Sequence, residues 1–141
     1  VEVFVDTNIL YYALTSGDDS RHRLAKNRIE RLWNEPGSAS LSVQVLQELH
    51  VNLQRKARLS PPQSWELVQP YLAWPVVDND RALLSLGHEM QLRWQLSFWD
   101  ALILAAAQRS GATTLWSEDL SANQNYGGFS VVNPLIEADR D

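Results

Sequence analysis

The sequence predicts one α/β domain of three layers, in which helices flank a short central, mostly parallel sheet of four to five strands. Short, continuously apolar segments of strand length alternate with longer segments of helical periodicity, the pattern of strands buried between covering helices. No internal repeat, low-complexity tract or linker divides the 141 residues, and this length is enough for one substantial core. We therefore expect residues 1–141 to form a single domain.

Apolar runs and capping residues locate the elements in the first part of the chain. Asp6 and Thr7 directly follow an apolar strand and begin a helix, and Ser42 and Ser60 are N-caps of later helices. Pro61 stands at a first helical position, where its missing N–H costs nothing. The expected elements are strand 1–5, helix 6–13, loop 16–19, helix 20–33, turn 35–38, strand 39–41, helix 42–56 and helix 60–72.

The same signals locate the remaining elements. Asp78-Asn79-Asp80 begins a helix, and Gly111 is the expected C-cap of the next one. The expected elements are strand 74–77, a helix to about residue 94, a helix from residue 98 to Gly111, strand 113–116 and strand 130–132.

Asp100 is the only charged residue in the apolar segment 98–107. Alanine and leucine at this density favour a buried helix, and an unpaired carboxylate there is costly unless it is hydrogen-bonded or bound to a cation. Two interpretations stay open at this point. Either Ser97 is the N-cap and Asp100 the third residue of a capping box, or Asp100 belongs to a functional site.

Three further acids are expected near one edge of the sheet. Asp6 follows the first strand, Asp119 follows strand 113–116, and Glu48 borders the apolar stripe of helix 42–56. The carboxyl ends of parallel strands form the edge at which such folds bind ligands. Each acid also has an ordinary structural role open to it, as an N-cap, a turn residue or the partner of an arginine, and Glu118 is a rival of Asp119.

Clustered carboxylates repel one another and therefore imply a counter-charge. At about 5 Å and an effective dielectric constant near 20, each charged pair costs about 3 kcal/mol. The cluster thus implies protonation or a bound hard cation. Oxygen ligands without cysteine or well-spaced histidine favour Mg²⁺ or Mn²⁺ over Zn²⁺, and His22, His50 and His88 are interpreted as structural or surface residues.

Composition narrows the functional classes. Hydrophobic residues make up 45% and charged residues 21% of the chain, there are no cysteines, and the net charge is −5. The absence of cysteine excludes disulfides and thiolate metal sites and is compatible with a cytoplasmic location. No apolar stretch is long enough to span a membrane, and no signal peptide is visible. The net charge argues against nucleic-acid binding through overall charge, although basic residues cluster at positions 21–31 and 55–58.

The ordered motifs resemble the PIN-domain ribonucleases, and among them the VapC-type toxins of bacterial toxin–antitoxin pairs. The matching segments span essentially the whole chain: Val5-Asp6-Thr7-Asn8-Ile9-Leu10, Ser42-Val43-Gln44-Val45-Leu46-Gln47-Glu48, Phe98 to Ala107, Leu115-Trp116-Ser117-Glu118-Asp119-Leu120 and Val131-Val132-Asn133-Pro134. Each segment alone is weak, whereas the ordered set is specific.

The resemblance implies Mg²⁺- or Mn²⁺-dependent cleavage of RNA. It implies that Asp6, Glu48, Asp100 and Asp119 form the metal and catalytic site and that Thr7, Asn8 and Ser117 orient those carboxylates. It also implies an RNA substrate, a cognate antitoxin protein and a homodimer. Basic residues must then attract RNA at longer range, and the candidates are Arg21, Arg23, Lys26, Arg28, Arg55, Lys56 and Arg58.

Two other interpretations are weighed beside this one. A structure-specific DNA nuclease would share the fold and the acids. A catalytically silent PIN-like binding module, or a receiver-type regulator, belongs to a different class. A receiver needs a lysine near its end, and the only lysines are Lys26 and Lys56. The tryptophans are expected to serve core packing, with Trp65 the least buried of the six.

Overall fold

A five-stranded parallel sheet forms the centre of the molecule. The structure, a computed structural model, describes residues 1–136, and its strands lie in the order β3-β2-β1-β4-β5 with every neighbouring pair parallel. The strands are β1 (Val3–Val5), β2 (Ala39–Ser42), β3 (Val76–Val77), β4 (Thr114–Trp116) and β5 (Ser130–Val132). The predicted α/β class and parallel sheet are confirmed.

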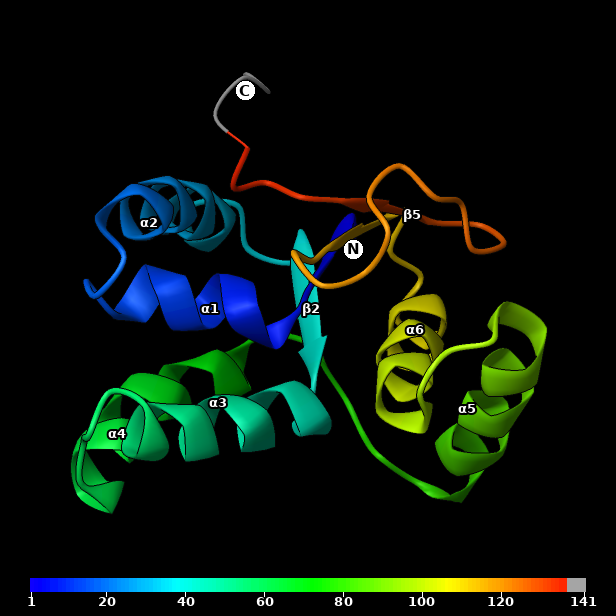
Figure 1. Cartoon of the computed structure of the whole chain (residues 1–141), viewed down its shortest axis with the longest axis horizontal. Coiled ribbons are helices and arrows are strands. Elements are labelled where there is room, and N and C mark those ends of the chain that lie inside the picture. The colour runs from blue at the N-terminus through cyan, green and yellow to red at the C-terminus, as the bar shows by residue number, and fades with distance from the viewer. Residues whose placement is uncertain (137–141) are drawn as a thin grey trace.

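Six α-helices flank the sheet within residues 1–136, so the predicted layering is also confirmed. They are α1 (Thr7–Leu14), α2 (Asp19–Trp33), α3 (Val43–Arg55), α4 (Pro61–Val68), α5 (Arg81–Trp94) and α6 (Phe98–Ser110). Figure 1 shows α5 and α6 together on one side of β2, with α1 to α4 on the other side. No helix in this part of the chain is long and apolar enough to cross a membrane.

A proline shortens two of the predicted elements. The helix expected over 60–72 ends at Val68 and continues as a 3-10 helix, η1 (Gln69–Ala73). Pro70 lacks an N–H and its ring crowds the preceding turn, so an α-helix cannot continue through it. The strand expected over 74–77 is confined to residues 76–77, because Pro75 offers only its carbonyl, which accepts a hydrogen bond from the Leu41 N–H.

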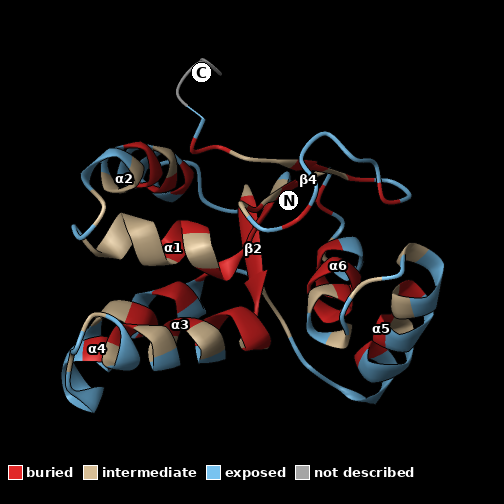
Figure 2. Ribbon diagram, viewed as in Figure 1, coloured by how far each residue is buried: buried red, intermediate tan, exposed pale blue. Residues whose placement is uncertain are grey.

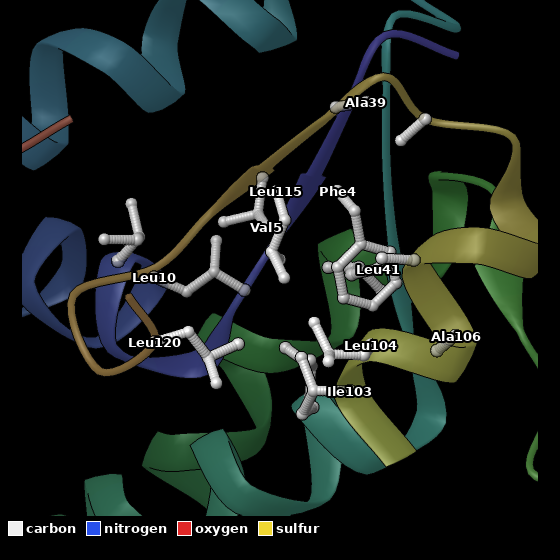
Figure 3. Close-up of a cluster of buried hydrophobic side chains, with 14 of the residues drawn as sticks. Phe4, Val5, Leu10, Ala39, Leu41, Ile103, Leu104, Ala106, Leu115 and Leu120 are labelled. Atoms are coloured by element: carbon white, nitrogen blue, oxygen red, sulfur yellow. The ribbon is translucent and has the colours of Figure 1, made fainter. Parts of the chain in front are cut away.

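The core fills the space between the sheet and α6. Phe4, Leu41, Leu104 and Leu115 are fully buried, and Figure 3 shows the side chains of the strands meeting those of α6. Figure 2 shows that β2 is buried along its whole length. The polar side chains that follow the strands are therefore held on a rigid frame.

The tryptophans depart from the expectation of core packing. Trp74 is buried, but Trp33 is 38% and Trp99 63% exposed. Successive residues on a helix point about 100° apart, so Phe98 packs against the core while Trp99, the next residue, turns to solvent.

Candidate functional site

The site lies where the chain order reverses across the sheet. From β1 the chain continues to β2 and β3 on one side, and it returns to place β4 and β5 on the other side. In open parallel sheets, a crevice at the carboxyl ends of the strands opens at such a switch point. Asp6 follows β1, and Ser117 to Asp119 follow β4, at the two strands that flank this point.

Asp6 is a buried carboxylate fixed by both of its oxygens. It is the N-cap of α1, its Oδ1 accepts a hydrogen bond of 2.7 Å from the Thr7 N–H, and its Oδ2 accepts one of 2.8 Å from the Ser117 hydroxyl. Burial raises the pKa of Asp6 from 3.8 to about 7; the two hydrogen bonds oppose this rise, and the charges of Glu48 and Asp119 add to it. Asp6 thus caps α1 with one oxygen and binds the loop after β4 with the other.

Glu48 is held toward Asp6 by two donors from different elements. The Thr7 hydroxyl donates to Glu48 Oε1 at 2.6 Å, and the Gln44 amide donates to Glu48 Oε2 at 3.0 Å. The same Gln44 amide group also lies 3.3 Å from the Trp99 carbonyl. Gln44 therefore links α3 to the first turn of α6, one residue before Asp100.

Ser117 organises the loop after β4. Its hydroxyl donates to Asp6 and accepts hydrogen bonds from the N–H groups of Asp119 and Leu120, at 3.1 and 3.3 Å. Asp119 is exposed, and its Oδ2 accepts a hydrogen bond of 3.0 Å from the Asn8 amide. This loop thus brings Asp119 to the start of α1.

Glu118 and Asp119 have different environments. Glu118 forms an ion pair of 2.6 Å with the Arg21 Nε, and Arg21 also pairs with Asp18. Asp119, in contrast, lines the crevice that also contains Glu48. Of the two acids that competed for the fourth position, Asp119 is the one that lies with the other carboxylates.

Asp100 occupies the third residue of α6. Its N–H donates to the hydroxyl of Ser97, the N-cap, at 3.1 Å, so this half of the predicted capping box is present. Its half-buried carboxylate makes no hydrogen bond or ion pair with any residue in the range 1–136. The carboxylate is therefore not occupied by a structural hydrogen bond or ion pair within these residues.

A crevice of about 620 Å³ opens beside the acids. Its lining includes residues the sequence pattern did not single out, among them Tyr11, Tyr12, Gln47 and Asn52. Gln44 was also missed, although its position four residues before Glu48 places both on one face of α3. Of the seven basic residues predicted to attract RNA, Lys56 alone lines this crevice.

The other predicted basic residues lie elsewhere within residues 1–136. Arg21 is paired with two acids, and Arg23, Lys26, Arg55 and Arg58 are exposed on α2 or at the end of α3. Arg28 is half-buried. Long-range attraction of RNA by these six cations remains a prediction.

The donor set suits a hard cation. The predicted ligands are carboxylate oxygens, which Mg²⁺ and Mn²⁺ prefer. The raised pKa of Asp6 comes mainly from burial, with a smaller contribution from the charges of Glu48 and Asp119. Within residues 1–136, no three acids or histidines are yet close enough to hold one ion together. The carboxylates are chemically suited to Mg²⁺ or Mn²⁺, but their oxygens do not surround one common position.

We expect Ser117→Ala to lower the free energy of unfolding by about 1–3 kcal/mol, because it leaves buried hydrogen-bonding groups of the loop without a partner. Ser40→Ala is the matched control, since Ser40 is fully buried and its hydroxyl has no hydrogen-bond partner in the described chain. Urea unfolding measures both. Equal losses in the two variants would contradict the role assigned to Ser117.

The fold and the site together define a class of protein: a parallel α/β domain with carboxylates that follow its strands at the switch point of the sheet. The chain belongs to the PIN-domain family of nucleases, whose model matches residues 3–126. No curated protein sequence matches the chain significantly.

Solved structures of VapC toxins resemble the chain over nearly its full length. The Mycobacterium tuberculosis toxin VapC20, described as cleaving the sarcin–ricin loop, is 25% identical, with a TM-score of 0.66, over 84% of this chain and 90% of that chain. A toxin–antitoxin complex from Klebsiella pneumoniae is 23% identical, with a TM-score of 0.68, over 95% and 98% of the two chains.

A third structure extends the same likeness in fold. VapBC2 from Rickettsia felis, bound to a DNA fragment from its promoter, is 19% identical, with a TM-score of 0.66, over 93% of this chain and 97% of that chain. The resemblance to PIN domains of the VapC type is therefore confirmed for family and fold.

Proposed function

We propose that this chain is a metal-dependent endoribonuclease and the toxin of a type II toxin–antitoxin pair. One observation carries the proposal: a buried carboxylate, Asp6, is fixed by two hydrogen bonds at the sheet's switch point, and its neighbour Thr7 lines a crevice together with two more acids, Glu48 and Asp119, whose charges act on Asp6. A residue that serves only as an N-cap does not require other carboxylates nearby.

The side chains divide the chemical work among them. Asp6 and Asp100 are the central ligands of Mg²⁺ or Mn²⁺, and Glu48 and Asp119 are ligands or position the attacking water. Thr7, Asn8, Ser117 and Gln44 hold these carboxylates in orientation. The bound ion would lower the pKa of water and polarise the phosphate. Attack by water on phosphorus would break the bond to the 3′ oxygen, leaving a 3′-hydroxyl and a 5′-phosphate.

RNA is the preferred substrate for two reasons. The VapC20 toxin, 25% identical to this chain, is described as cleaving an RNA loop. Selective RNA-binding proteins usually target such unpaired segments, whose bases are accessible. By the same analogy with the solved toxin–antitoxin complexes, we propose a protein antitoxin, a homodimeric toxin and action in the cytoplasm.

A substrate panel tests the activity. Hairpin RNAs with unpaired loops and branched DNA flaps are incubated with the wild-type chain and Mn²⁺, Mg²⁺ or EDTA. We expect metal-dependent cleavage within RNA loops, none in EDTA, and intact DNA. Asp100→Asn should lose about 10²–10⁴-fold in rate and relieve toxicity on expression. Cleavage of the DNA alone would favour the DNA nuclease, and no cleavage of any substrate would favour the silent module.

A further inference from the structure

Two helices form facing walls of the crevice. On α1, Asn8, Tyr11 and Tyr12 lie on one face, since residues three and four apart are neighbours on a helix. On α3 and its C-cap, Glu48, Asn52 and Lys56 follow the same spacing of four. α1 and α3 pack against each other, so the crevice runs along both helices.

The charge along this crevice changes sign. Glu48 and Asp119 mark one end, whereas Lys56 marks the other. Along α3, Glu48 and Lys56 are separated by about 12 Å at 1.5 Å per residue, so one phosphate group cannot contact both. An RNA strand with one phosphate at the acids therefore has another segment of its backbone beside Lys56.

Tyr11 stands between the two ends with a ring available to a ligand. It is half-buried and lines both the acidic crevice and a second hollow of about 670 Å³ that continues past it along the loop after α1. The neighbouring Tyr12 ring is covered by the paired Arg21 guanidinium, 5.5 Å from its centroid. The Tyr11 ring packs at 73° to the Tyr12 ring, with 6.0 Å between the centroids, and it also lies 5.9 Å from the flexible Lys56 ammonium, which can turn away to a phosphate.

We propose that Tyr11 stacks an unpaired nucleobase next to the cleaved bond and that Lys56 contacts the adjoining phosphate. This subsite rests on the proposed ribonuclease function and deepens it. Aromatic side chains stack bases of any sequence, and a lysine contact to phosphate is equally independent of sequence. The enzyme then requires an unpaired nucleotide beside the cut, so it selects loops by their structure.

The test uses a hairpin RNA that the wild-type chain cleaves. Tyr11→Leu keeps apolar bulk without an aromatic ring, and we expect it to raise KM about 10-fold with kcat changed by less than about threefold, as for the loss of one base stack. Tyr11→Phe keeps the ring and should stay within about twofold of wild type. On an RNA with an abasic nucleotide beside the cut, the wild type and Tyr11→Leu should have the same KM.

A cation outside the predicted RNA-binding set supplies the control. Lys56→Gln should make the dependence of log KM on log salt shallower by about 0.7, the value for one phosphate contact on a single strand. Arg81→Gln removes an exposed cation at the start of α5 and should leave the slope unchanged. The subsite would be overturned if Tyr11→Leu had the same KM as Tyr11→Phe. It would also be overturned if the wild type and Tyr11→Leu still differed in KM wherever the abasic nucleotide was placed beside the cut. Failure of the wild type to cleave any RNA would instead overturn the ribonuclease itself.

Discussion

Asp6→Asn is expected to abolish RNA cleavage while it stabilises the metal-free protein. The activity falls by about 10²–10⁴-fold, because the neutral amide is a poor ligand for a divalent cation and no longer fixes the ion or its water. Stability changes in the opposite direction. Asp6 is 5% exposed, and burial holds its pKa near 7, so at pH 8 the folded chain carries a buried charge that asparagine lacks.

The size of the stability gain follows from the pKa. A rise from 3.8 to about 7 corresponds to roughly 4 kcal/mol lost from the free energy of unfolding once the carboxylate is ionised, so we expect Asp6→Asn to recover roughly 2–4 kcal/mol at pH 8 in EDTA. The unfolded carboxylate ionises above about pH 4, so the gain develops between about pH 4 and 7: at pH 5 it should be roughly two fifths of its value at pH 8, and below pH 4 it should vanish. Urea unfolding of the wild-type chain and of Asp6→Asn at pH 5 and pH 8 measures the gain in stability at each pH.

Two further variants separate the effect on activity from the effect on stability. Asp119→Asn replaces an exposed carboxylate of the same crevice, and it should reduce activity with little change in stability. Asp78→Asn, an exposed acid between β3 and α5, should change neither. If Asp6→Asn destabilised the metal-free protein at pH 8, the carboxylate would be a structural cap rather than a charge held for a ligand.

The sequence predicts the frame well because its signals are local. Ser42, Ser60 and Ser97 are N-caps as expected, and Gly111 is a left-handed C-cap at φ 81°. The exceptions arise at Pro70 and Pro75, where a proline inside or beside an apolar segment shortens an element.

The site is harder to predict because its geometry depends on contacts between distant segments. The resemblance assigned Ser117 a supporting position, but no pattern shows that its hydroxyl joins Asp6 to the loop of Asp119, more than a hundred residues away. Likewise, the sequence leaves open whether Glu118 or Asp119 is the fourth acid, because the distinction depends on Arg21 of α2, which pairs with Glu118. No sequence pattern singles out Tyr11 and Tyr12 either, because their place in the crevice depends on α3, which forms the opposite wall.

Metal binding should be strongly linked to pH through the same carboxylate. A divalent ion binds the deprotonated form, so below the folded pKa of about 7 it must displace a proton. We expect the affinity for Mn²⁺ to fall by a factor that approaches tenfold for each pH unit below 7, roughly 50-fold between pH 7 and 5, and to level off above pH 8. Binding should release close to one proton at pH 6 and about a tenth of that at pH 8.

The stability of the metal-free protein also depends on pH through Asp6. Because the pKa is raised in the fold, the protonated carboxylate is favoured by folding, and the free energy of unfolding decreases as pH rises from about 4 to 7. Added Mn²⁺ offsets this loss, so it should raise the melting temperature more at pH 8 than at pH 5.5.

Calorimetry in two buffers of different ionisation enthalpy counts the released protons, and thermal melts with Mn²⁺ or EDTA follow the stability. Asp6→Asn should lose the proton release, whereas Asp78→Asn should retain it. Equal Mn²⁺ affinity at pH 5 and 8 for the wild-type chain would mean that Asp6 is not a ligand, and the metal site would then have to be built around other carboxylates. A wild-type affinity that falls with pH while Asp6→Asn keeps the same slope would assign the titration to Glu48, Asp100 or Asp119 instead.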